Sequence, residues 1–320
     1  MSFNYNVKEF NGQKVQDFEK DKGITDTNIA YRIAWDWDSE EEITENLEVL
    51  FNDSKVSELK NIVIGSYGES DESPAEAIRL FIEHKDKLQN LQGIFWGDIT
   101  YEQNECSWIE NDNFGMFLYA FPKLEVFRVR GGNSLGFSFL DHQNLKTLII
   151  ESGGLAKNIF EEISTANLPA LEHLELWLGS DSYGFESSAK EVTMAYRGKD
   201  KKNHLPSLKY LGLRNSEIAD KIAVEMINDP ILKRIEILDY SKGIFANNGA
   251  SAILNNPLMK NLKKIDLHHN FVSDKLAKEL EVQFGNKIDL SEREALPDGV
   301  DTTSDDFDIY DYDMYIEVSE

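Results

Sequence analysis

The chain of 320 residues has a single cysteine, Cys106, and only 33 lysines and arginines against 58 aspartates and glutamates. One cysteine excludes an internal disulfide framework and a zinc site built from several cysteines. The formal net charge of −25 disfavours a dedicated nucleic-acid binder, because such a protein needs a basic surface to meet phosphates. The same charge disfavours docking on an anionic membrane. We therefore expect neither nucleic acid nor a membrane among the partners.

Long apolar runs and catalytic motifs are also missing. No stretch reaches the length of a transmembrane helix, and the first residues, MSFNYNVKEF, lack the charged and apolar regions of a signal peptide. The chain has no Gly-x-Ser-x-Gly, no glycine-rich phosphate loop with its lysine, and no Gly-x-Gly-x-x-Gly. These absences predict a soluble, cytoplasmic protein that is not an enzyme and carries no cofactor.

What the sequence does contain is a repeat: a leucine, two variable residues, an apolar residue, one variable residue and another apolar residue. Its eight copies begin at Leu59, Leu91, Leu124, Leu145, Leu171, Leu208, Leu232 and Leu262. Alternation at period two predicts that each apolar-x-apolar triplet is a short strand with one buried face. A single strand of this kind cannot bury that face alone, so the copies must stack side by side.

The segments between the copies favour helices. First leucines are 21 to 37 residues apart, and a connection between parallel strands needs a dozen residues or more. Apolar residues recur at helical spacing in several of these segments, for example over 43–51 and 276–284. The pattern therefore predicts an α/β solenoid of strand–helix units with a parallel sheet.

The repeats resemble the leucine-rich-repeat family, in its ribonuclease-inhibitor-like variant. The best copies are LKYLGLRNSEIADKIAVEMI from Leu208 and LKKIDLHHNFVSDKLAKEL from Leu262. The resemblance implies a horseshoe with parallel strands on the concave face and helices on the convex face. The chain departs from the family in its irregular spacing, in a mostly missing asparagine ladder and in inserts at 97–121 and 179–205. The whole chain is similar to bacterial leucine-rich-repeat proteins of this size, a likeness that brings no assigned activity.

The two ends of the chain differ from the repeats. Residues 1–24 are expected to form a capping hairpin, 25–292 the solenoid, and 293–320 an acidic tail. From Tyr310 to Val318 the tail alternates apolar and polar residues, which is unusual for a solvating segment. We hypothesise that this part of the tail is an ordered terminal strand that folds back on the body.

The variable residues of each strand point to the face opposite the buried one, so they predict the lining of the concave face. Aromatic and arginine side chains among carboxylates are typical of protein-binding hot spots. The expected binding residues for a protein or peptide partner are Arg128, Arg130, Glu151, Glu175, Trp177, Tyr210, Arg214, Glu236, Asp266 and His268. Trp177 weighs most in this interpretation, because an outward tryptophan has no evident structural role. We expect the binding protein to be a monomer.

Two alternative functions depend on single residues of this lining. Acidic tails and ribonuclease-inhibitor-like repeats occur in the Ran GTPase-activating proteins. This coarse resemblance implies regulation of a GTPase or another enzyme by an inserted arginine, with Arg130 or Arg214 as nominal candidates. Glu236, Asp266 and His268 on adjacent strands could hold a cation for hydrolysis. A polar surface patch is the commoner explanation of such a trio, so we predict no metal site and no catalytic residue.

Overall fold

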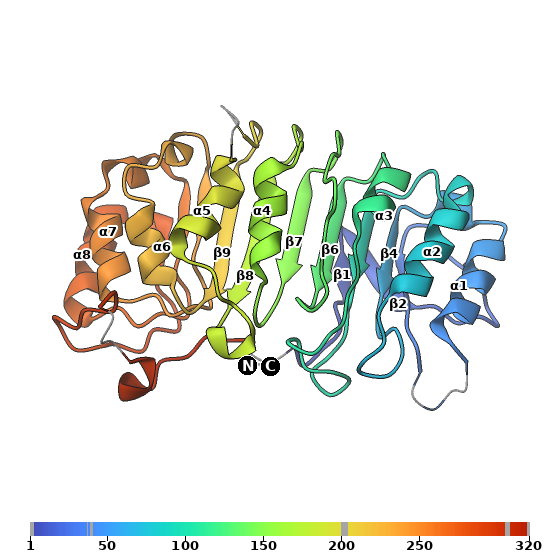
Figure 1. Ribbon diagram of the computed structural model, residues 1–320, viewed down its shortest axis with the longest axis horizontal. Helices are drawn as coiled ribbons and strands as arrows, with labels where there is room; N and C mark the ends of the chain where they lie inside the picture. Colours follow the sequence, from blue (N-terminus) through green and yellow to red (C-terminus); the bar gives the residue numbers. More distant parts are fainter. Residues whose placement is uncertain (1–2, 37, 39–40, 200–203, 305–307, 319–320) are drawn as a thin grey trace. The chain divides into compact units, whose positions relative to one another are not determined.

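The computed structural model describes residues 3–36, 38, 41–199, 204–304 and 308–318. The chain divides into two compact units, and Figure 1 labels their helices and strands and colours the chain from blue at the N-terminus to red at the C-terminus. The N-terminal unit contains residues 2–151 and 166–171, and the C-terminal unit contains 152–165 and 172–319. The boundary between the units lies inside the repeat region. The segments expected from the sequence have their boundaries elsewhere, between the repeat region and the two chain ends.

The strands of the N-terminal unit follow one another in chain order. β1 and β2 form an antiparallel hairpin that turns at Asn11 and Gly12, and every later strand pairs in parallel with the one before it. The strands are β1 (Glu9–Phe10), β2 (Gln13–Asp17), β3 (Ala30–Ile33), β4 (Asn61–Ile64), β5 (Gly93–Trp96), β6 (Val126–Arg130) and β7 (Thr147–Glu151). The helices are α1 (Ile43–Asn52), α2 (Ala75–Glu83) and α3 (Gly115–Ala120).

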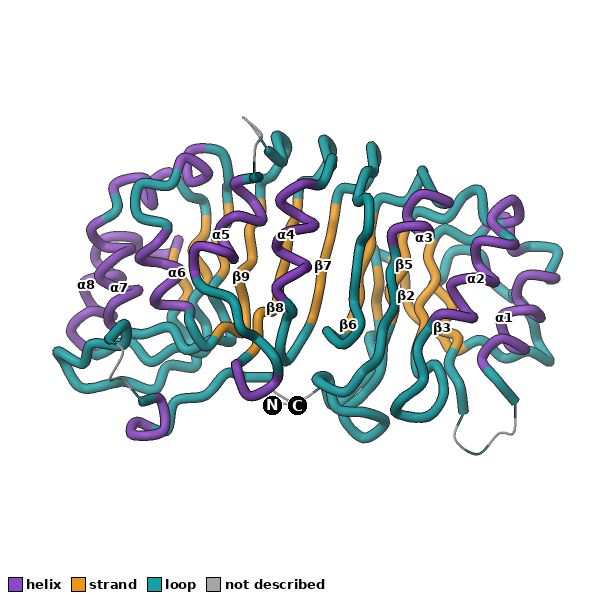
Figure 2. Tube along the Cα trace, viewed as in Figure 1, coloured by secondary structure: helices purple, strands orange, loops and turns teal. Residues whose placement is uncertain are grey.

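In the C-terminal unit a helix precedes or follows every strand (Figure 2), and β8 to β12 pair in parallel, each with the next. The strands are β8 (His173–Gly179), β9 (Tyr210–Ser216), β10 (Ile237–Asp239), β11 (Lys264–Asp266) and β12 (Ile288–Asp289). The helices, each packed against the next, are α4 (Lys157–Thr165), α5 (Ala189–Arg197), α6 (Ala219–Glu225), α7 (Asn247–Asn255) and α8 (Asp274–Phe284).

The apolar repeat positions pair with one another across the strands. Ile94 lies opposite Phe127 and Phe127 opposite Leu148 in the N-terminal unit, and Leu174 lies opposite Leu211 in the C-terminal unit. All five side chains are fully buried, because alternate residues of a strand face the same side of the sheet. The predictions of an α/β chain and of parallel strand pairing are confirmed.

One repeat lies in a register different from the predicted one. The repeat pattern predicts that Ile235 and Ile237 are buried strand residues. Ile235 is buried, but it lies before the strand, and Leu238 is the residue opposite Leu211 and Ile265. Leu238 and Tyr240 are fully buried, whereas Ile237 faces the other side of the strand. Both alignments satisfy the apolar pattern, and a shift by an odd number of residues exchanges the two faces.

The N-terminal segment covers part of the sheet face that the sequence analysis expected to be open. Val63 and Phe95 occupy outward strand positions, yet both are fully buried in a second small core with Phe10 and Ala30. The segment is held at Asp98, whose carboxylate accepts hydrogen bonds from the Val7 amide at 3.2 Å. Residues 3–10 therefore occupy the outer side of β4 and β5.

The acidic tail folds back on the C-terminal unit, but no strand forms at 310–318. Ile309–Tyr312 form a short 3₁₀ helix, η7, and residues 313–318 after it belong to no helix or strand. Their backbone groups bond instead to the side chain of Asn215 and to the carbonyl of Lys242. Met314, Ile316 and Val318 are buried.

Candidate interaction face

The outward side chains of β8 to β11 form one continuous set in the C-terminal unit. They alternate with buried leucines such as Leu174 and Leu176, so they project from the opposite side of the strands. We call this set the C-terminal face. Its members are His173, Glu175, Trp177, Tyr210, Arg214, Asp239, Ser241, Lys264, Asp266 and His268.

Glu175 is the centre of the first half of this face. Its carboxylate accepts hydrogen bonds from the Trp177 indole at 2.7 Å and from the Arg214 guanidinium at 2.7 Å, and it lies 3.2 Å from the His173 ring. Burial alone would raise the pKa of Glu175, but the His173 hydrogen bond, the Arg214 charge and the Trp177 hydrogen bond together lower it to about 2. The carboxylate is therefore charged, and it fixes the side chains around it.

Aromatic rings and Arg214 are held beside this carboxylate. The ring of Tyr210 stacks on His173 with 3.8 Å between centroids and 5° between planes. Its hydroxyl donates to Asp239 at 2.6 Å. The Arg214 guanidinium donates to Ser241 at 2.9 Å and lies 5.0 Å from the centroid of the Trp177 ring. These contacts leave few free torsions, so the face is organised before any partner arrives.

Asp266 organises the second half of the face. Its carboxylate lies 2.6 Å from the Lys264 ammonium and 2.8 Å from the His268 ring. Although burial opposes it, the hydrogen bonds from His268 and Lys264 lower the pKa of Asp266. The hydrogen bond to Asp266 raises the pKa of His268, against the smaller opposing effect of burial. A cationic imidazole beside a carboxylate is therefore the stable pairing.

Replacing this histidine should make the protein less sensitive to pH. The raised pKa of His268 means that its contribution is fully present below the unfolded-state pKa of about 6.5 and is lost as the pH rises through the folded-state value. We expect the wild type to exceed His268→Gln by about 0.5–1 kcal/mol in free energy of unfolding at low pH, and by less at high pH. Urea unfolding of both proteins at pH 5.5 and pH 8.5 measures this; an equal difference at both would contradict the assignment.

Trp177 has the structural role that the sequence did not reveal. Its side chain is only 5% exposed. It donates to Glu175, and both the Arg214 guanidinium and the Lys242 ammonium lie over its ring. An outward strand position is thus compatible with near-complete burial, and Trp177 supports the face more than it forms the surface.

Arg128, Arg130 and Glu151 lie in the N-terminal unit and form a network of their own. Glu151 accepts from Arg130 Nε at 2.8 Å and from Arg128 Nε at 3.0 Å. Arg130 is 1% exposed, since its guanidinium lies 3.5 Å from the Phe3 ring centroid and donates to the Ile99 carbonyl at 2.7 Å. The sequence correctly assigned these side chains to outward positions, but the N-terminal segment covers Arg130.

Glu236 does not lie on the C-terminal face. It precedes β10, and its carboxylate lies 2.7 Å from the Lys263 ammonium at the surface. Because of the register shift, Asp239 and Ser241 occupy the positions that the sequence analysis gave to Glu236 and Leu238. The alternative apolar pattern Ile235–Leu238–Tyr240 was the signal that could have identified them. The trio proposed for a cation, Glu236 with Asp266 and His268, is consequently not assembled.

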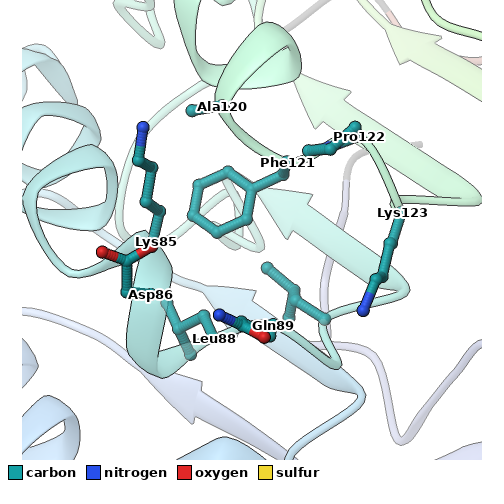
Figure 3. Close-up of a pocket in the computed structure, with 9 residues that line it drawn as sticks. Lys85, Asp86, Leu88, Gln89, Ala120, Phe121, Pro122 and Lys123 are labelled. Carbon is teal, nitrogen blue, oxygen red and sulfur yellow. The ribbon is translucent and has the colours of Figure 1, made fainter.

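A separate cavity of about 230 Å³ lies in the N-terminal unit, near the end of α3 (Figure 3). Leu88 and Phe121 supply apolar surface, and Lys85, Lys123 and Asp86 carry the charged groups around it. None of the predicted binding residues lines this cavity.

Neither a metal-binding cluster nor a membrane-spanning helix is found in the described part of the chain. Within the part of the chain that the structure describes, no three or more His, Cys, Asp or Glu side chains are grouped so as to hold a metal ion. Among the described helices, none has both the length and the apolar character needed to cross a membrane. Cys106 is buried and unbridged.

Comparisons with known proteins give one informative similarity. No family model and no curated protein matches the chain. An internalin from Listeria monocytogenes aligns over 84% of this chain and 61% of its own, but at 11% identity and a TM-score of 0.38 it carries no argument. A protein from Bacteroides fragilis of known crystal structure is 32% identical, with a TM-score of 0.75 over 83% of this chain and 75% of its own. The chain therefore belongs to the same protein family as this Bacteroides fragilis protein.

Proposed function

We propose that the protein is a non-catalytic interaction module that binds a protein or peptide partner on its C-terminal face. The observation that carries this proposal is the pre-organised set of aromatic, arginine and carboxylate side chains on β8 to β11. His173, Arg214 and His268 are partly exposed, with 29%, 14% and 24% of their side chains accessible. Partly exposed charged and aromatic groups fixed by their neighbours lose little entropy when a partner binds.

The proposal extends to the architecture. Stacked strand–helix units of this kind curve when helices are wider than strands, so we propose a ribonuclease-inhibitor-like horseshoe whose concave face carries the binding residues. The net charge of −25 favours a soluble monomer, and we propose that it works in the cytoplasm. A partner with basic groups would best complement this charge.

The geometry does not favour the two alternative functions, regulation of a GTPase and metal-assisted hydrolysis. Neither Arg130 nor Arg214 offers a free guanidinium, since Glu151 holds the first and Glu175 and Ser241 hold the second. An arginine that stabilises a transition state in a GTPase must reach into the partner. The hydrolase hypothesis depended on Glu236, which pairs with Lys263.

Photo-crosslinking tests the C-terminal face directly. A photoreactive amino acid replaces Lys264, whose side chain is 46% exposed on this face, and in a matched variant it replaces the exposed Lys278 on α8. We expect the variant at 264, and not the variant at 278, to capture one specific polypeptide from cells. Crosslinks of equal yield from both positions, or from 278 alone, would contradict the proposal.

Affinity for the captured polypeptide then tests the side chains. Tyr210→Ala removes the ring that stacks on His173 and should weaken binding at least about tenfold, as expected for an aromatic hot spot. Tyr119→Ala, at an exposed tyrosine of α3, is the control and should leave the affinity unchanged. Equal affinities for the two variants would remove Tyr210 from the site.

A further inference from the structure

The C-terminal residues occupy a groove in their own unit, along the ends of β9, β10 and β11. Asn215 near the end of β9 and Lys242 and His269 just after β10 and β11 are equivalent residues of the three repeats, each four positions after the paired residues Leu211, Leu238 and Ile265. All three have left-handed backbones, with φ of 50°, 67° and 58°. The repeat therefore places similar turns side by side, and residues 314–318 run across them. We call this surface the tail groove.

Glu317 and Val318 are held in the tail groove through hydrogen bonds of their backbone groups. The fully buried Asn215 amide accepts from the Val318 N–H at 2.9 Å and donates to the Val318 carbonyl. The Glu317 N–H donates to the Lys242 carbonyl at 2.8 Å. Paired contacts to the N–H and C=O of one residue are how proteins recognise an extended peptide.

Side chains of alternate residues enter the groove. Met314, Ile316 and Val318 are at most 7% exposed, whereas Tyr315 between them is 46% exposed. Met314 and Ile316 pack against an apolar cluster formed by Ile244, Ala246, Phe271 and Leu296. The Glu317 carboxylate pairs with the Lys242 ammonium. Apolar residues at alternate positions and one acid therefore define what the groove accepts.

The chain's own segment does not fill the groove. A cavity of about 240 Å³ remains between Met314, Ile316 and residues of the neighbouring turns, including Ser180, Tyr183 and Glu217. The cavity is open to solvent, so further side-chain atoms could enter it beside the segment. A peptide with a larger apolar side chain in place of Met314 or Ile316 could occupy it.

We propose that the tail groove is a binding site for an extended acidic peptide of a partner protein, in which apolar residues alternate and a carboxylate meets Lys242. Residues 314–318 are its intramolecular occupant, and the partner's segment displaces them. A tethered occupant competes only at an effective concentration in the millimolar range, so a better-fitting peptide can replace it. The tail groove adjoins the C-terminal face, since the Lys242 ammonium that meets Glu317 also lies 5.6 Å from the centroid of the Trp177 ring. Neither proposal depends on the other.

Binding of a peptide in trans tests this proposal on the full chain. Ile316→Asp places a charge in the apolar cluster and should release the chain's own segment. The probe is a fluorescent peptide with the sequence of residues 309–318, followed by anisotropy. We expect Ile316→Asp to bind it at least tenfold more tightly than the wild type, in which the groove is occupied. Adding Asn215→Ala should abolish this gain, and a peptide with lysine at the Glu317 position should bind at least fivefold more weakly.

Several results would overturn the proposal. Equal binding to the wild type and to Ile316→Asp would place the peptide elsewhere, and no binding to a folded Ile316→Asp protein would show that the groove does not accept a peptide. Val318→Asp, which disrupts the other end of the segment, is the second variant, with folding checked by circular dichroism. Loss of the fold in both variants would make residues 314–318 part of the permanent core, and the proposal would fail.

Discussion

Arg130→Ala is expected to destabilise the protein by about 3–5 kcal/mol, the range for removing one partner of a buried ion pair. Arg130 is 1% exposed, and its charge lies among two buried carboxylates: Glu151 at 2.8 Å and Asp98 at 3.9 Å. Without the guanidinium, both carboxylates would stay buried with fewer favourable charge interactions to offset their loss of hydration. Burial has the largest influence on the pKa of Asp98 and raises it. The Arg130 charge is the largest of the influences that lower it.

The free energy of unfolding in urea measures this effect. Arg79→Ala is the control, because Arg79 is an exposed residue of α2 that pairs with Glu76 and Glu83 on the same helix. Solvent screens an exposed pair of this kind, so its loss should change the free energy of unfolding very little. If Arg130→Ala destabilised the protein no more than Arg79→Ala, Arg130 would be accessible to solvent, and the sequence-based assignment of Arg130 to an open binding surface would stand.

Phe95→Ala is expected to destabilise the protein by a similar amount, about 3–5 kcal/mol, the range for removing a buried phenylalanine ring. The ring is fully buried in the second core of the N-terminal unit, 6.1 Å from the Phe10 ring centroid, and the Arg128 guanidinium lies 4.1 Å above it. The substitution leaves a cavity under the N-terminal segment and removes a cation–π contact.

This prediction separates a covered strand face from an open one. On an open face Phe95 would be a surface residue, and its replacement would change stability by less than about 0.5 kcal/mol. Tyr119→Ala provides the comparison, since Tyr119 is 78% exposed. Urea unfolding of the two variants beside the wild type gives both values. A small effect at Phe95 would mean that residues 3–10 do not cover β4 and β5 in solution.

The outward strand face is covered in the N-terminal unit and partly exposed in the C-terminal unit. Arg130 and Phe95 are both buried beneath residues 3–10, whereas His173 and His268 keep side-chain surface accessible to a partner. The two units therefore use outward strand positions differently, one for a second core and one for a charged, partly exposed face. The proposed interaction site follows from this difference.

Local pattern was sufficient to predict the strands. A period of two and a leucine three residues before each triplet identify the buried residues, because only one alternation places the apolar side chains on one side. Ile94, Phe127 and Leu148 pair as that pattern requires. Where two alternations were both apolar, as at Ile235 to Tyr240, the sequence alone could not choose, and Glu236 was assigned to the wrong face.

The α/β architecture follows from the repeated strand and helix patterns, and the outward positions of Arg130, Trp177 and Arg214 follow from residue spacing within each repeat, because neighbouring residues of a strand alternate between its two faces. Which of these outward side chains remain accessible depends on contacts that form when the whole chain folds. Phe3 reaches Arg130 and Val318 reaches Asn215 from 127 and 103 positions away in the sequence. Exposure depends on what covers a side chain, and contacts so distant along the chain leave no periodic signal at the residues they bury.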